Sequence, residues 1–86
     1  MGRSQRPRPT RLGQKLKLIR TKLGLTQAEM VEKLGVKNEP VYAASISQYE
    51  RGLREPSLIV ILRYARLAGV PMETLVDDKL RLRPRH

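Results

Sequence analysis

The sequence predicts an all-α domain of five short helices with a basic segment at each end. Apolar residues in the centre of the chain recur at the three- and four-residue spacing of amphipathic helices, and no central segment alternates as a strand does. Glycines follow the ends of these runs, where a left-handed residue commonly terminates a helix. Four of the six glycines stand at such ends: Gly24, Gly35, Gly52 and Gly69.

With 86 residues, the chain is short enough to form one domain, and it has no cysteine for a disulfide or a thiolate metal site. Its formal net charge is +10. Residues 1–11 and residues 79–86 contribute +4 each, which leaves +2 for the rest of the chain. We therefore predict a disordered basic arm (residues 1–9), a helical domain (10–77) and a basic C-terminal tail (78–86).

This charge distribution favours a polyanionic partner, nucleic acid first and an anionic membrane surface second. The alternative is that the tails only aid solubility. No apolar run approaches the roughly 20 residues that span a bilayer, and the N-terminal residues lack the apolar stretch of a secretory signal. We therefore expect a cytoplasmic protein without a membrane partner.

The first helix is predicted from Thr10 to the glycine at position 24. Its apolar face is formed by four residues at helical spacing: Leu12, Leu16, Ile19 and Leu23. Gly13 lies inside this helix, where glycine costs about 1 kcal/mol relative to alanine.

The second helix has the clearest start signal, because Thr26 and Glu29 form a capping box and Leu25 with Met30 can form a hydrophobic staple around it. Gly35 ends this helix after about nine residues. A helix this short requires tertiary packing. Three further residues of the helix are expected to face inward: Ala28, Val31 and Leu34.

Residues 36–41 are predicted to be a connector, although Pro40 can also be the first residue of the third helix. That helix runs through Ile46 and Tyr49 to about Arg51. Ser57 is the expected N-cap of the fourth helix, and the fifth helix covers residues 71–76. The expected buried stripe of the fourth helix is Leu58, Ile61, Leu62, Ala65 and Ala68.

Two charged residues lie where apolar residues belong. Arg20 follows Leu16 by four residues on the first helix, and Glu50 follows Ile46 by four residues on the third. Because an unpaired buried charge is very costly, we predict that Arg20 and Glu50 pair and hold the two helices together. The alternative is that both side chains reach solvent from the edge of the apolar stripe.

The opposite face of the third helix is small and polar. Ala44, Gln48 and Arg51 share this face, with Ser45 and Ser47 beside them. Glutamine can pair with adenine, serine can donate or accept, and alanine can touch a thymine methyl group. An ordinary solvated helix face is the alternative interpretation.

Five short motifs follow one another along the chain: Leu-Thr-Gln-Ala-Glu from position 25, Leu-Gly-Val from 34, Ser-Ile-Ser-Gln-Tyr-Glu-Arg-Gly from 45, Arg-Glu-Pro-Ser from 54 and Leu-Ala-Gly-Val-Pro from 67. In this order they resemble the Cro/C1-type (Xre-like) helix-turn-helix family of phage and bacterial repressors. The resemblance covers residues 11–76. It implies a lambda-repressor-like domain whose second and third helices form the helix-turn-helix, with the third in the major groove.

The resemblance also implies roles for individual residues. Gln27, with Thr26 beside it, matches the family glutamine that touches a phosphate and braces the recognition helix. Arg51 and Arg54 match DNA-backbone contacts, and the predicted ion pair matches the family's internal salt bridge. The positions that match base-contacting residues are Ala43, Ala44, Ser45 and Gln48, with Ser47 as a further candidate.

The sequence departs from the family pattern in one place. Nine residues separate Val36 from Ile46, whereas about four are common in the family. Either the connector bulges, or the recognition helix starts near Pro40. In both cases three residues of this stretch become candidate DNA contacts: Lys37, Asn38 and Tyr42.

The basic ends acquire a role from this context. Arg3, Arg6 and Arg8 are candidates for the minor groove or for phosphates. The C-terminal tail is a candidate contact for DNA, RNA or a partner protein, or Leu80 and Leu82 pack at a dimer interface. The resemblance implies palindromic double-stranded DNA, bound by a homodimer formed through the fifth-helix region.

Two function classes remain at this point: a sequence-specific transcriptional regulator, most simply a repressor, and an antitoxin or adaptor whose main partner is a toxin or the transcription machinery. We predict no enzyme, no cofactor and no metal. The one histidine is the terminal His86, and Asp77 with Asp78 is better explained as a solvated helix end than as a metal site.

Overall fold

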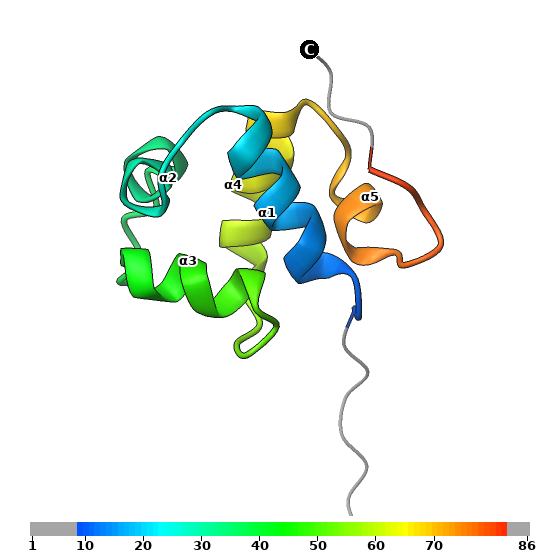
Figure 1. Ribbon diagram of the computed structural model, residues 1–86, viewed down its shortest axis with the longest axis horizontal. Helices are drawn as coiled ribbons and strands as arrows, with labels where there is room; N and C mark the ends of the chain where they lie inside the picture. The colour runs from blue at the N-terminus through cyan, green and yellow to red at the C-terminus, as the bar shows by residue number, and fades with distance from the viewer. Residues whose placement is uncertain (1–8, 83–86) are drawn as a thin grey trace, which may run out of the picture.

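The computed structural model describes residues 9–82, so the predictions for Arg3, Arg6 and Arg8 lie outside the described residues. These residues form five helices and no strand, which confirms the all-α prediction. The helices are α1 (Leu12–Lys22), α2 (Gln27–Leu34), α3 (Ala43–Glu50), α4 (Leu58–Ala68) and α5 (Met72–Val76). Figure 1 shows α1 and α4 in the middle of the molecule, with α2 and α3 on one side and α5 on the other.

All five helices contribute side chains to a single core. None of them is long enough to be stable alone in water, so each depends on this packing. The most completely buried side chains come from every helix: Leu16, Ile19, Met30, Leu34, Ile46, Val60, Tyr64 and Leu75. Burial of this apolar surface, at about 25 cal/mol per Å², holds the short helices in place.

Most of the predicted helix ends are confirmed, although α1 begins at Leu12 and not at Thr10. The Thr26 hydroxyl accepts from the Glu29 backbone N–H at 3.0 Å, and the Glu29 carboxylate accepts from the Thr26 N–H at 2.8 Å. The Ser57 hydroxyl accepts from the Val60 N–H at 3.2 Å and so caps α4. Gly35 ends α2 in the left-handed conformation, with φ of 61°. The proposal that Pro40 opens the third helix is wrong, because α3 begins at Ala43.

Three residues that were predicted to be buried are exposed: Leu23, Ala28 and Leu58. Leu23 is the C-cap of α1, where the chain already leaves the helix. Leu58 is the first residue of α4 and lies at the edge of a buried stripe that includes Val60 and Tyr64 instead. Helical spacing was correct in these segments, but the phase of the buried face depends on the neighbouring helices.

The chain after α5 folds back onto α1. The Asp78 carboxylate accepts from the Thr10 backbone N–H at 2.9 Å, the Thr10 hydroxyl at 3.0 Å and the Arg11 N–H at 3.0 Å. These donors precede the first turn of α1, where backbone N–H groups lack helical partners. Leu82 is 8% exposed and joins the core. The predicted domain boundary at residue 77 is therefore too early, and Leu82 does not belong to a free tail or an exposed dimer surface.

Lys15 was not singled out in the sequence, yet it is buried against α5. Its ammonium group donates to the backbone carbonyl of Thr74 at 2.7 Å and to that of Asp77 at 2.9 Å. A cation is favoured at this end of a helix, where carbonyl groups are left unpaired. Burial lowers the pKa of the Lys15 ammonium, while the carboxylates of Asp78 and Asp77 oppose that shift.

Asp78 makes the stability of the domain dependent on pH. Hydrogen bonds from the backbone N–H groups of Thr10 and Arg11 hold the pKa of the Asp78 carboxyl below its ordinary value. The pKa of Asp78 is thus lower in the folded protein than in the unfolded chain. The ionised carboxylate therefore stabilises the fold fully above about pH 5. This stabilisation is lost as the pH falls below the unfolded-state pKa of about 3.9 towards the lower folded-state pKa. We expect the stability difference between the wild type and Asp78→Asn, measured by urea unfolding, to shrink over that range. Glu73→Gln is the control, and an equal dependence on pH in that pair would contradict the prediction.

Tyr64 is fully buried in α4, and its hydroxyl group has no hydrogen-bond partner among the described residues. Burial raises the pKa of this phenol. A buried polar group without a partner costs about 1–3 kcal/mol, so Tyr64→Phe is expected to leave stability unchanged or to raise it by up to about 1 kcal/mol. Thermal unfolding of the two proteins measures this difference. A loss of stability in Tyr64→Phe would show that the hydroxyl group makes a stabilising interaction.

Candidate nucleic-acid interface

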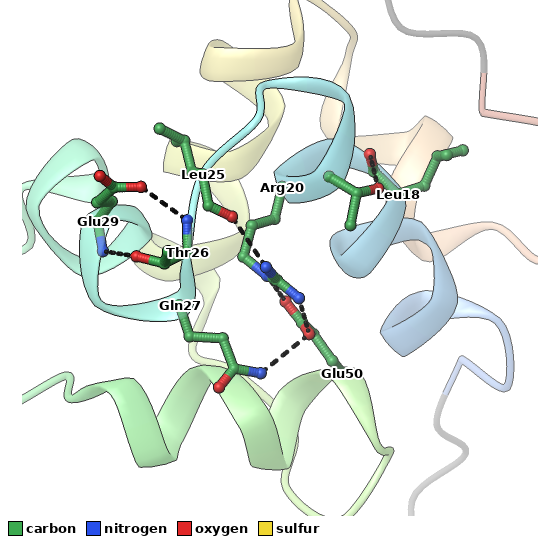
Figure 2. A network of polar contacts seen from close by, with 8 residues as sticks. Leu18, Arg20, Leu25, Thr26, Gln27, Glu29 and Glu50 are labelled. Atoms are coloured by element: carbon green, nitrogen blue, oxygen red, sulfur yellow. Dashed lines mark hydrogen bonds and ion pairs between the residues drawn. The ribbon is translucent and has the colours of Figure 1, made fainter.

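The Arg20–Glu50 ion pair predicted from the sequence is present and joins α1 to α3. The Arg20 Nε lies 2.6 Å from Glu50 Oε2, and Arg20 Nη2 donates to Glu50 Oε1 at 3.0 Å. The Glu50 side chain is 3% exposed, so the alternative that both groups reach solvent is wrong. The hydrogen bond to Glu50 raises the pKa of the Arg20 guanidinium. Arg20 Nη1 also donates to the Leu25 carbonyl at 2.9 Å, which ties the start of α2 to the same cluster (Figure 2).

Gln27, the first residue of α2, contacts the third helix through this ion pair. Its amide Nε2 donates to Glu50 Oε1 at 3.3 Å, and Figure 2 shows the side chain extending from α2 towards α3. The bracing contact implied by the resemblance is therefore present in the structure. The Gln27 side chain is only partly buried, so its other face remains accessible.

Gly13 explains how α1 approaches the C-terminal end of α3 so closely. A Cβ atom at this position would lie 2.7 Å from the Tyr49 carbonyl oxygen and 2.8 Å from the Glu50 carbonyl oxygen. Both neighbours are backbone atoms, which cannot rotate away as a side chain can. From the sequence, Gly13 was expected only to lower the stability of the first helix. The structure shows that a glycine is needed there for α1 to pack against α3.

The outer surface of α3 and of residues 51–54 after it is accessible and contains no acid. From position 42 to 54 the exposed residues are Tyr42, Ala44, Gln48, Arg51, Gly52, Leu53 and Arg54. Glu50 is turned inward to its ion pair. Ala44, Gln48 and Arg51 are spaced by four and three residues, so they share one helix face. This face therefore presents an amide, a methyl group and a cation, without a carboxylate that would repel a polyanion.

Ser45 does not belong to that surface, which corrects the sequence-based prediction. It is 3% exposed, and its hydroxyl accepts from the Tyr42 backbone N–H at 3.1 Å. This contact caps the start of α3, so the hydroxyl is turned to its own backbone. Ala43 and Ser47 are half-buried, whereas the Tyr42 side chain is 66% exposed.

A groove of about 450 Å³ lies between the start of α1 and the end of α3. Pro9, Gln14, Arg51 and Arg54 are among the residues that line it. The Arg54 guanidinium lies 6.0 Å from the centre of the Tyr49 ring, which holds this cation at the end of α3. Pro9 directly follows the segment that carries Arg3, Arg6 and Arg8, so this segment joins the domain beside the two exposed arginines.

Within residues 9–82, no three His, Cys, Asp or Glu side chains gather in a group that can hold a metal ion. No helix in this range is long and apolar enough to cross a membrane.

Comparison with known proteins places the chain in a family. A family model described as helix-turn-helix matches residues 16–75, which is most of the chain. The chain belongs to the Cro/C1-type helix-turn-helix family. The resemblance noted from sequence motifs is thereby confirmed, and α2 and α3 are the two helices of the motif.

Two known proteins are similar to this helix-turn-helix domain, one in structure and one in sequence. A crystal structure of the P22 c2 repressor with synthetic operator 9T superimposes with a TM-score of 0.65 at 25% identity, covering 78% of this chain and 94% of the repressor chain. The HTH-type transcriptional regulator ImmR of Bacillus subtilis (strain 168) is 37% identical over 65 residues. That match covers 76% of this chain but only 47% of ImmR, so the helix-turn-helix domain spans about half the length of this relative.

Proposed function

We propose that this helix-turn-helix protein is a sequence-specific, double-stranded DNA-binding transcriptional regulator of the repressor type, acting in the cytoplasm. The observation that carries the proposal is the exposed, acid-free surface of α3, which is fixed by the Arg20–Glu50 pair to the rest of the domain. The two relatives support it, since one is a transcriptional regulator and the other a repressor in complex with an operator.

In this proposal α3 lies in the major groove, where its exposed side chains meet base edges. Gln48 pairs with an adenine, and the Ala44 methyl group touches a thymine methyl group. Ala43 and Ser47 flank these contacts from half-buried positions.

Backbone contacts surround the base contacts and set the register of α3 on the duplex. Arg51 and Arg54 contact phosphates at the C-terminal end of α3, and Gln27 with Thr26 contacts a phosphate at the start of α2. Helix N-termini favour anions, which supports the second contact. Arg3, Arg6 and Arg8 add phosphate or minor-groove contacts, and the basic residues of the tail strengthen the same attraction.

We also propose a symmetric homodimer on a palindromic site with half-sites one helical turn apart. The sequence resemblance implies a dimer contact near α5, where Val76 is 37% exposed. More apolar surface lies elsewhere: Leu58 is 72%, Leu53 62% and Ile59 42% exposed, at the α3–α4 turn and the first turn of α4. We therefore shift the proposed dimer contact towards these three residues.

The same apolar residues are the reason to keep a second candidate function. A toxin or a component of the transcription machinery can cover Leu53, Leu58 and Ile59 in place of a second copy. The domain then serves as an antitoxin or adaptor, and a small protein co-purifies with it in stoichiometric amount. An antitoxin that also binds DNA is compatible with both proposals.

Selection of duplexes from a randomised library by the full chain tests DNA binding directly. We expect a preferred, palindromic sequence and an affinity that falls steeply with salt. Gln48→Ala is expected to lose about tenfold in affinity for the preferred duplex and little for a scrambled one, because a bidentate base contact contributes about 1–3 kcal/mol. Arg51→Ala is expected to weaken binding to both duplexes equally.

Thr21→Ala is the control for a polar side chain, since Thr21 is exposed near the end of α1 and does not line the α1–α3 groove. A wild-type protein that binds all duplexes alike would contradict the proposed function. Equal losses for Gln48→Ala on both duplexes would remove Gln48 from the base contacts.

A further inference from the structure

We propose that the α2–α3 turn, residues 35–42, is a preorganised second DNA-contacting element and that Glu39 is the residue that positions it. The inference rests on the proposed function and adds a contact surface to it. Neither helix of the motif contains Glu39, and nothing in the sequence pattern drew attention to it.

The turn is long but is anchored at two points. Glu39 Oε1 accepts a hydrogen bond from the Ser57 hydroxyl at 2.7 Å, across to the start of α4. Val41 is 9% exposed and belongs to the hydrophobic core. A long surface loop without such contacts would be variable in conformation, so these two anchors select one arrangement of the turn.

The contact with Ser57 also turns the negative charge of Glu39 towards α4. A carboxylate next to DNA repels phosphates, but here it is directed to the N-terminal end of α4, where the helix dipole favours negative charge. Ser57 accepts from the Val60 N–H and donates to Glu39, so the carboxylate extends the cap of α4. The exposed residues left between positions 36 and 42 include no acid: Lys37, Asn38, Pro40 and Tyr42.

The position of the turn brings these residues to the duplex. It leads directly into the N-terminal end of α3, and in a helix-turn-helix the N-terminal residues of the recognition helix contact base edges. Asn38 precedes Tyr42 by four residues, which span at most about 14 Å of chain. The major groove is about 12 Å wide, so the turn can reach the edge of the groove and the phosphates there while α3 lies inside it.

The chemistry of the exposed residues fits that location. The Lys37 ammonium is a point charge for a phosphate, and the Asn38 amide can pair with a base edge or donate to a phosphate. The Tyr42 hydroxyl is a donor at the start of α3. The turn thus widens the contacted DNA beyond the bases that α3 reaches by itself.

Two substitutions test the contact and the anchor separately, on the duplex that the wild type selects and on a scrambled duplex. Lys37→Ala is expected to reduce the slope of log affinity against log salt by about one, because one phosphate contact is lost. Lys22→Ala removes the same charge from the exposed C-terminal end of α1 and is expected to leave that slope unchanged.

Glu39→Ala tests the anchor and is compared with two controls. Glu39→Gln keeps an acceptor oxygen for Ser57 but removes the charge. Glu32→Ala removes an exposed carboxylate from α2. Loss of a negative charge alone raises affinity for every duplex. We expect Glu39→Ala instead to lose at least fivefold in discrimination between the two duplexes, while Glu39→Gln and Glu32→Ala keep it. Circular dichroism shows that each variant is folded in the assay.

A salt slope for Lys37→Ala equal to that of Lys22→Ala would overturn the inference, as would full discrimination in Glu39→Ala. In both cases the wild type still prefers its selected duplex, so the proposed function stands. If the wild type has no preferred duplex, the proposed function falls and the inference falls with it.

Discussion

Replacing Arg20 by methionine while Glu50 remains is expected to lower the free energy of unfolding by about 3–5 kcal/mol, because a buried carboxylate is left without its counter-charge. Glu50 is 3% exposed at its side chain and has Arg20 at 2.6 Å. Gln27 at 3.3 Å is a neutral donor and does not replace the charge. Small domains have total stabilities at the low end of about 5–15 kcal/mol, so this loss approaches the whole stability of the fold.

A double-mutant cycle measures the pair itself. Arg20→Met, Glu50→Leu and the double variant are compared by urea unfolding, and the double variant is expected to be more stable than the sum of the two single losses predicts. Arg63→Met removes an exposed arginine from α4 and is expected to change stability by no more than about 0.5 kcal/mol. Simple addition of the two single losses would mean that Arg20 and Glu50 do not interact.

The ion pair has a consequence for DNA binding, because it fixes the third helix against the first. The Arg20 guanidinium contacts Glu50 of α3 and the carbonyl of Leu25 just before α2. Both helices of the motif are thereby held to α1. A folded variant without the pair is expected to discriminate less between duplexes while it keeps its non-specific affinity for DNA. Base contacts depend on the position of α3, whereas charge attraction does not.

Gly13→Ala is expected to destabilise the domain by about 1–2 kcal/mol after the gain in helix propensity is subtracted, so the sign is opposite to that of helix propensity alone. In an exposed helix, alanine in place of glycine would add about 1 kcal/mol of stability. Here the new methyl group would lie 2.7 Å and 2.8 Å from the carbonyl oxygens of Tyr49 and Glu50, so α1 and α3 must move apart. Forcing extra volume into a packed contact typically costs about 1–3 kcal/mol.

Thermal or urea unfolding of Gly13→Ala gives the sign directly. Gln14→Ala, at the next position and exposed, is the control and is expected to stay within about 0.5 kcal/mol of the wild type. A stabilised Gly13→Ala protein would show that the two helices separate at no cost. The close approach would then not be needed to place α3.

Local signals in the sequence were sufficient for the number of helices and most of their ends. The Thr26–Glu29 box and the Ser57 cap act within a few residues, and a glycine with positive φ such as Gly35 needs no distant partner. The family motifs carried the resemblance that the family comparison confirms. The Arg20–Glu50 pair was also predictable, because two opposite charges on apolar stripes have few other ways to be stable.

Burial and long-range contacts could not be derived in this way, because they depend on how helices distant in sequence pack together. Helical spacing allowed Ser45 to be placed on the outer face of α3, but packing buries it and gives its hydroxyl to Tyr42. Lys15 caps α5 from 59 residues away, and Asp78 holds the start of α1 from a segment predicted to be a free tail.

The sequence alone thus determined that this protein is a five-helix helix-turn-helix domain with an internal ion pair, since caps, glycines and family motifs are local features. Only the tertiary structure decided which side of each helix reaches solvent. It also showed that a Cβ atom at position 13 would collide with the backbone of α3, and that the Glu39 carboxylate in the α2–α3 turn accepts a hydrogen bond from Ser57. Those answers depend on atoms brought together from distant parts of the chain, and the spacing of residues along a single helix does not contain them.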